Sequence, residues 1–191
     1  AAAVLDFLGA KYPDGKAAKK GDLISDTRRD YAEASARLHQ KPEYANRIYG
    51  HFVEDQKRNE RWLQYWFFYF YNDFNLVGNI IGAGRHEGDW EMIQLRLGAD
   101  TVPTVATYAQ HDRAQALRWS ELDRRNADGH PVPVVFVGRG SHASFARAGQ
   151  HDPIWPLPPD YADGLGPRGR PRLEIIGDAA PGWASWPGLW G

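Results

Sequence analysis

The chain has 191 residues, a net charge of −1 and no cysteine. Its 23 basic and 24 acidic residues nearly balance, and this argues against a nucleic-acid-binding protein. Without cysteine there are no disulfides and no thiolate metal ligands. A hydrophobic content of 42% is typical of a globular protein with a buried core, and we expect a single domain over residues 1–191.

The sequence shows no targeting or membrane segment. Residues 1–6 lack a basic region followed by a long apolar run, so no signal peptide is expected. The most apolar stretch, Trp62 to Tyr71, has about ten residues, whereas a spanning helix needs roughly 20. We expect a soluble protein without a transmembrane segment, either cytoplasmic or secreted from a trimmed precursor, and the sequence leaves the oligomeric state open.

The first 60 residues are strongly charged and are expected to form a helical or irregular flank. Ser25 or Asp26 is a suitable N-cap for a helix that runs to about His39. Pro42 prevents the helix from continuing. We expect this helix to cover an edge or a face of a sheet.

Residues 61–191 are expected to form the β-rich core. The almost wholly aromatic run from Trp62 to Tyr71 is typical of a central strand covered on both faces. Further strands are predicted at Asp89 to Leu97, Thr101 to Tyr108, Val132 to Val137 and Leu173 to Ile176. Residues 111–131 are expected to be a loop or short helix, and residues 152–171 a loop.

The stretch from His86 to Glu91 predicts a divalent-metal site. Alternation along a strand places Asp89 and Glu91 on one face, which continues into an apolar stripe. Two carboxylates beside a core repel each other, and a bound cation removes that conflict. A bulge at Gly88 would shift the parity of the strand and bring His86 to the same face.

The next predicted strand brings a second histidine toward this motif. If residues 89–97 and 102–110 form an antiparallel hairpin, Asp89 lies opposite Gln110 and Glu91 opposite Tyr108. His111 then lies close to Gly88. Histidine and carboxylate ligands without cysteine favour Mg²⁺, Ca²⁺ or Mn²⁺ over Zn²⁺. The alternative is a buried salt-bridge network in which His86 or Arg85 pairs with the carboxylates.

Ser141 and His142 lie among small residues at the end of another predicted strand, where a ligand could approach closely. The alternative is a turn in which Ser141 bonds its own backbone. For the remaining histidines a surface or packing role is expected; they are His39, His51, His130 and His151.

Four motifs carry a family resemblance: residues 62–73, residues 86–91, Tyr108-Ala109-Gln110-His111 and Gly140-Ser141-His142-Ala143. Together they resemble the bacterial members of the vacuolar protein sorting-associated protein 62 family. Tyr44 to Gly50 and Trp186 to Gly191 fit the same family, so that the resemblance covers residues 30–191. It implies that the chain starts inside the family's full domain, and it implies no particular activity.

The spacing His-x-x-Asp-x-Glu is also similar to that of the necrosis-inducing Nep-like proteins, which bind a divalent cation on an actinoporin-like antiparallel β-sandwich. This resemblance implies the same fold here, with His86, Asp89 and Glu91 as metal ligands. It also implies Asp73 as the upstream ligand, although the gap to His86 is longer in this chain. The sphingolipid binding of those toxins is not carried over, because they rely on disulfides and secretion.

Three functions follow from such a site. The first is a metal-dependent hydrolase of a glycan, lipid or phosphoester, with His111 and His142 as the catalytic residues and Gln110, Ser141 and Tyr108 contacting the ligand. The second is a metal-assisted module that binds lipid headgroups or sugars without catalysis. The third is a purely structural ion or salt-bridge network.

Overall fold

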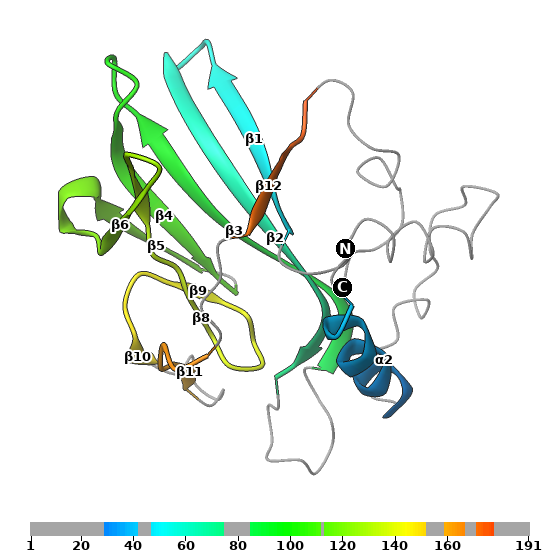
Figure 1. Cartoon of the computed structure of the whole chain (residues 1–191). Coiled ribbons are helices and arrows are strands. Elements are labelled where there is room, and N and C mark those ends of the chain that lie inside the picture. Colours follow the sequence, from blue (N-terminus) through cyan, green and yellow to red (C-terminus); the bar gives the residue numbers. More distant parts are fainter. Residues whose placement is uncertain are drawn as a thin grey trace. The chain divides into compact units, whose positions relative to one another are not determined.

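A computed structural model describes residues 29–41, 47–74, 85–111, 113–151, 159–166 and 171–177. These residues are mainly β, with a helix that ends at His39 (Figure 1). In chain order the elements are α2 (Arg29–His39), β1 (Arg47–Asp55), β2 (Glu60–Asp73), β3 (Arg85–Leu97), β4 (Pro103–Gln110), β5 (Arg113–Arg118), the 3₁₀ turn η2 (Trp119–Glu121), β6 (Arg124–Ala127), β7 (His130–Pro133), β8 (Phe136–Val137), β9 (Ser144–Phe145), β10 (Gly149–His151), β11 (Asp160–Ala162) and β12 (Arg172–Ile175).

Six strands form one sheet in the order β12-β1-β2-β3-β4-β5, and the short strands form the ladders β6–β7, β8–β9 and β10–β11. The pairs whose register is described are antiparallel. The predicted mainly β, antiparallel fold with a helical segment near the N-terminus is therefore confirmed. The predicted cap at Ser25 or Asp26 lies outside the described residues. No helix among those residues is long and apolar enough to cross a membrane.

The chain divides into two compact units. The first draws on residues 1–49, 67–90 and 169–191, and the second on residues 50–66 and 91–168. Strands β1, β2 and β3 contribute residues to both units, whereas β4 to β11 belong to the second.

β2 is the central strand that its aromatic run predicts. It has a hydrogen-bonded neighbour on each side, and residues 60–70 are all partly buried, so that both of its faces are partly covered. Aromatic side chains favour such positions because they pack against neighbouring strands on a pleated surface.

β3 shows the predicted alternation of burial. Asp89, Glu91, Ile93 and Leu95 are buried on one face. The register with β4 differs from the prediction by two residues, because Ile93 rather than Glu91 pairs with Tyr108. An even shift keeps every side chain on its predicted face, since the side-chain period of a strand is two.

Several predicted loops contain strands. Residues 111–131 hold β5, β6 and the start of β7, β11 lies within residues 152–171, and β1 lies in the flank predicted to be helical or irregular. β5 is an edge strand whose side chains are mostly exposed, so its composition is polar. In the hairpin, Asp128 and Gly129 have φ values of 52° and 84° and join the paired Ala127 and His130, the geometry that an Asp-Gly turn provides.

The predicted strand from Val132 to Val137 is divided between β7 and β8. Within the second unit, the β8–β9 ladder packs beside β4. Gln110 Nε2 donates to the Ser144 carbonyl at 3.2 Å, and the buried Tyr108 hydroxyl donates to the Val134 carbonyl at 3.1 Å. A short ladder and the segment that precedes it, rather than a long strand, therefore cover this face of β4.

Candidate functional site

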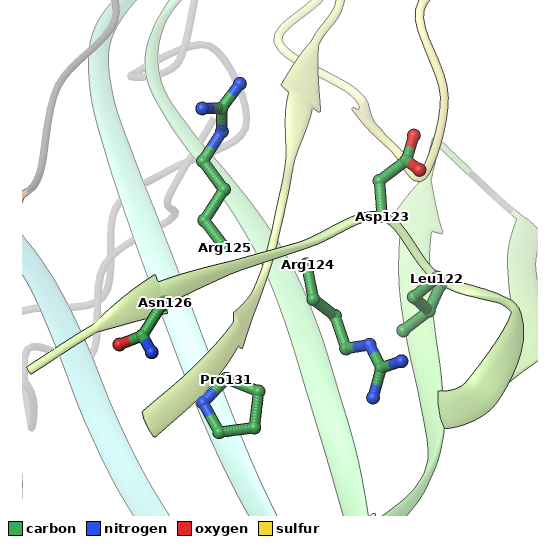
Figure 2. Close-up of a pocket in the computed structure, with 6 residues that line it drawn as sticks. All are labelled: Leu122, Asp123, Arg124, Arg125, Asn126 and Pro131. Atoms are coloured by element: carbon green, nitrogen blue, oxygen red, sulfur yellow. The ribbon is translucent and has the colours of Figure 1, made fainter. Parts of the chain in front are cut away.

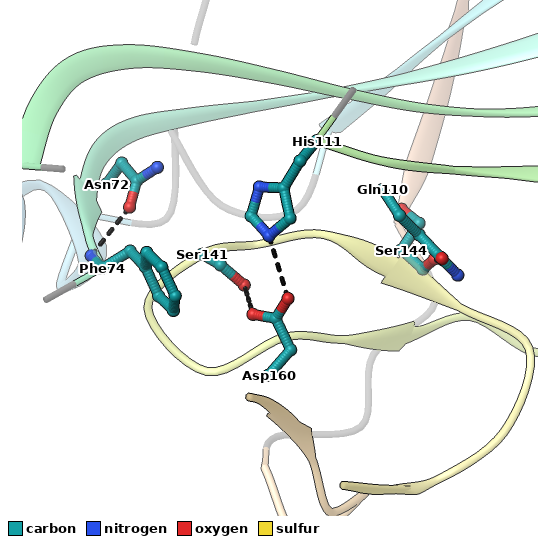
Figure 3. A network of polar contacts seen from close by, with 7 residues as sticks. All are labelled: Asn72, Phe74, Gln110, His111, Ser141, Ser144 and Asp160. Atoms are coloured by element: carbon teal, nitrogen blue, oxygen red, sulfur yellow. Dashed lines mark hydrogen bonds and ion pairs between the residues drawn. The ribbon is translucent and has the colours of Figure 1, made fainter. Parts of the chain in front are cut away.

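Three segments of the second unit converge on the carboxylate of Asp160 in β11 (Figure 3). His111, which follows β4, brings its Nε2 to 2.9 Å from Asp160 Oδ2. Ser141, in the turn between β8 and β9, donates its hydroxyl to Asp160 Oδ1. Ser141 and Asp160 are buried, whereas the His111 side chain retains 28% of its exposure. We call these three residues the Asp160 cluster.

The protonation of Asp160 is set by opposing effects. Burial by itself raises the pKa of this carboxyl. The hydrogen bonds from His111 and Ser141, together with the charges of His111 and His151, outweigh burial and lower the pKa below its ordinary value. The cluster therefore favours an ionised Asp160, and it is strongest when the His111 ring carries a positive charge.

The backbone around the cluster adopts conformations that side chains rarely accept. His111 and His142 have φ values of 53° and 57°, and Gly140 has a φ of 85°. Left-handed conformations cost non-glycine residues on the order of 1 kcal/mol or more, and they are concentrated at functional sites.

The turn that carries Ser141 is fixed by its backbone. Gly138 N donates to the Ala143 carbonyl at 2.8 Å, and His142 N donates to the Gly138 carbonyl at 3.0 Å. Arg139 N donates to the Tyr161 carbonyl at 2.8 Å, and this bond ties the turn to β11. A Cβ at position 138 would lie 2.5 Å from Ser141 Oγ, so glycine is needed to leave room for the hydroxyl.

The β3 carboxylates form a separate candidate. Asp89 and Glu91 are 9% and 7% exposed and lie on the same face of β3. Gly88 has a φ of 71°, the left-handed conformation that a glycine bulge uses. His86 belongs to the same strand, but its side chain lies outside the described residues. Asp73 ends β2 and is exposed.

Among the described side chains, no three His, Asp or Glu residues are arranged to hold a metal ion. That set omits the His86 side chain, so the predicted four-residue ligand set stays a prediction. The expected proximity of His111 to Gly88 also stays a prediction.

The residues predicted to contact a ligand have partners within the second unit. Tyr108 is fully buried, and burial together with the charge of Asp123 raises its pKa to about 12. Ser141 bonds to Asp160, and Gln110 bonds to the Ser144 carbonyl. His142 lies in the turn beside Ser141. The structure thus brings Ser141 and His111 to one carboxylate.

Sequence reasoning missed Asp160 altogether. The residue lies in a stretch predicted to be loop from its proline and glycine content, and no motif marks it. His151 was expected to have a surface or packing role, and its ring stacks on Phe145 with centroids 3.6 Å apart. Register also places His151 opposite Asp160 in the β10–β11 ladder.

A shallow pocket lies along the β6–β7 hairpin (Figure 2). Its lining combines the carboxylate of Asp123 with the guanidinium groups of Arg124 and Arg125, whose side chains leave β6 in opposite directions. Arg124 also lies 5.6 Å from the centroid of the Trp119 ring. Because charges of both signs line this pocket, it favours no single class of ligand.

These features define a mainly β, antiparallel protein with a pair of buried carboxylates on β3 and a single buried carboxylate in the Asp160 cluster. No family model matches the chain. It is 30% identical over 162 residues to vacuolar protein sorting-associated protein 62 of Saccharomyces cerevisiae, a match that covers 72% of this chain and 33% of that protein. A putative vacuolar protein sorting-associated protein of the same yeast, TDA6, is 30% identical over 134 residues, with 60% and 28% covered.

The resemblance to the vacuolar protein sorting-associated protein 62 family is therefore confirmed. The chain spans roughly a third of the length of these curated relatives. A solved structure described as a toxin fold for microbial attack and plant defense aligns with a TM-score of 0.44 at 12% identity, covering 71% of this chain and 53% of that one.

Proposed function

We propose that the chain binds a divalent cation through the β3 carboxylates Asp89 and Glu91, with His86 and Asp73 completing the ligand set. The observation that carries the proposal is that both carboxylates are buried and, being two residues apart in β3, lie on the same face of the strand. Two residues along a strand correspond to about 7 Å, a distance at which two buried negative charges repel each other.

Both carboxylates also interact with other groups of the chain, so a cation is not their sole means of stabilisation. What favours the cation is the donor chemistry. Carboxylate oxygens, with at most one histidine, suit hard ions such as Mg²⁺, Ca²⁺ or Mn²⁺ better than Zn²⁺. The left-handed backbone at Gly88 supports the inclusion of His86, because a bulge there changes the face on which the preceding residues lie.

Calorimetric titration of the purified chain with Ca²⁺, Mg²⁺, Mn²⁺ and Zn²⁺ tests this proposal. We expect binding of a hard ion and a loss of affinity beyond 10–100-fold, the effect typical of outer-shell residues, in Asp89→Asn and Glu91→Gln. Glu54→Gln is the matched control, since Glu54 is an exposed carboxylate in a strand. A wild-type chain that binds none of the four ions, with an unchanged melting temperature, contradicts the proposal.

For the bound cation we propose a hydrolytic role on a glycan, lipid or phosphoester. A cation of this kind polarises the bond to be cleaved or lowers the pKa of bound water. The Asp160 cluster supports this role, because a partly exposed histidine held by a buried carboxylate is a group suited to proton transfer.

A second candidate is a binding module without catalysis, and a polar strip across three strands of the second unit favours it. Gln64 in β2 accepts a hydrogen bond at 3.4 Å from Trp66 Nε1 and donates one at 3.4 Å to Gln94 in β3. His51 in β1 lies 3.4 Å from the same Gln64 oxygen. A partly exposed indole with amide groups beside it combines an apolar face with hydrogen-bonding groups, and small-molecule binding sites use the same combination.

Glycan-array and liposome binding, with and without EDTA, separates the two candidates. Binding that disappears with EDTA and in Trp66→Ala, without any product, favours the module. Turnover that disappears in His111→Asn while cation binding persists favours the hydrolase. Asparagine is chosen at position 111 because it tolerates the left-handed backbone.

A further inference from the structure

We propose that Asp160 is the positioning residue of a proton-transfer histidine, His111, and that Ser141 holds the carboxylate in place. The inference deepens the hydrolase part of the proposed function and rests on it. None of the sequence motifs includes Asp160, which lies 49 residues from His111 in sequence.

The hydrogen-bond partners and the exposure of the three residues decide which of them can take part in catalysis. Ser141 is 1% exposed and its hydroxyl bonds to Asp160 rather than to the histidine, so it is not placed as a nucleophile. Asp160 is likewise buried. His111 is the member that reaches the surface, with 28% of its side chain exposed. The chemistry that remains is acid–base catalysis by His111.

Asp160 acts on His111 in two ways. The bond of 2.9 Å to Nε2 fixes the orientation of the ring, and a buried negative charge at that distance favours the doubly protonated ring. Ser141 supplies the second bond to the carboxylate, on the oxygen that His111 does not use. The left-handed backbone at His111 is a strain that this anchoring offsets.

The step that follows is hydrolysis of an ester by water. His111 takes one proton from the attacking water as its oxygen forms a bond to the ester carbon or phosphorus. The bond to the leaving oxygen then breaks, and His111 returns the proton to that oxygen. Water is the only co-reactant, and no change of oxidation state occurs.

The first test is an NMR titration of the histidine ring protons in the whole chain. We expect Asp160→Asn to lower the midpoint of His111 by roughly one pH unit, because the opposite charge is lost. His130, an exposed histidine of the β6–β7 hairpin, serves as the internal control. Asp163→Asn is the matched control variant, since Asp163 is an exposed carboxylate three residues further on. An unchanged His111 midpoint in Asp160→Asn overturns the proposal.

The second test measures turnover of p-nitrophenyl acetate and bis(p-nitrophenyl) phosphate by the cation-loaded chain across pH. We expect His111→Asn to lower kcat by at least roughly 100-fold, and Asp160→Asn to lower kcat and move the acidic limb of the pH profile downward. If Asp160→Asn does not fold, Asp160→Glu keeps the charge and is expected to retain the profile.

Cation titration of the same variants keeps this inference separate from the β3 site. Unchanged affinity in His111→Asn, together with lost turnover, supports the proton-transfer role. Wild-type turnover equal to that of His111→Asn, or no turnover at all, overturns that role and leaves the cation site to its own titration.

Discussion

The pair of β3 carboxylates and the Asp160 cluster differ in how the chain assembles them. Asp89 and Glu91 are two residues apart on one strand, so local geometry alone places them on the same face. Asp160 meets Ser141 and His111 across 19 and 49 residues, so only tertiary structure brings them together. The first arrangement places two like charges on one strand face, in addition to the contacts that each makes with other groups of the chain, whereas the second surrounds a single charge with hydrogen-bond donors. The two should therefore respond to different extents when a carboxylate is neutralised.

The largest effect on stability is expected when Asp160 of the cluster and Glu91 of the β3 pair are each replaced by an uncharged side chain. In cation-free protein at pH 7 we expect Asp160→Asn to lower the free energy of unfolding by about 2 kcal/mol, because hydrogen bonds to a charged group contribute roughly 1.5–3 kcal/mol. We expect Glu91→Gln to cost less than this, since relief of the repulsion from Asp89 offsets part of the loss of the other contacts of Glu91. Urea denaturation measures both, with Asp163→Asn as the control. Equal destabilisation by the two variants would remove the distinction.

Acidification sharpens the role of Asp160. Its pKa in the folded chain lies below the value of about 3.9 for an unperturbed Asp. The stabilisation from this group is therefore complete above about pH 4 and is lost as the pH falls through the folded pKa. We expect the stability difference between wild type and Asp160→Asn to shrink below about pH 4. A difference that stays constant from pH 7 to pH 2 would contradict this assignment.

Gly138→Ala disturbs the cluster through packing alone. The new Cβ would meet Ser141 Oγ at 2.5 Å and Phe145 at 3.3 Å, so Ser141 must move away. We expect a loss of about 1–3 kcal/mol in the free energy of unfolding, as for other overpacked sites. Gly166→Ala is the control, because no atom lies within 4 Å of the Cβ it would add. Thermal or urea denaturation measures the free energy of unfolding of the two variants. Equal stability of Gly138→Ala and Gly166→Ala would contradict the prediction.

Tyr108→Phe tests the contact between β4 and the segment after β7. Loss of the bond to the Val134 carbonyl should cost about 1 kcal/mol at pH 7. Tyr108 has a pKa of about 12 against an ordinary value of 10.0, so its contribution is present below pH 10 and is lost between pH 10 and about 12. The variant should lack that alkaline loss in urea denaturation at pH 9 to 12.

His142→Gly is expected to have the smallest effect on stability. Glycine adopts the φ of 57° without strain, and this gain offsets the loss of the side-chain contacts. We expect the free energy of unfolding to change by less than about 1 kcal/mol. A ligand role for His142 would then be seen as lost binding or turnover in a stably folded variant. A loss of several kcal/mol would instead mean that its side chain is a structural element of the turn.

The sequence by itself determined the central aromatic strand, the helix that ends at His39 and the buried face of β3. All three follow from local periodicity, which survives even a register error of two residues. It did not reveal β5, because an edge strand with exposed side chains lacks an apolar pattern. Nor did it reveal the β6–β7 hairpin, whose strands have four residues each and carry mostly exposed side chains.

Only the tertiary structure decided the Asp160 cluster. A single aspartate in a proline- and glycine-rich stretch has no periodic signal, and its role depends on which side chains reach it after folding. Ser141 was expected beside a ligand, yet its hydroxyl bonds to a buried carboxylate, because the Gly138 turn and the bond from Arg139 to Tyr161 place it there. The local sequence pattern thus defined which residues lie on the same strand face. Long-range packing defined which side chains form hydrogen bonds to the same buried carboxylate.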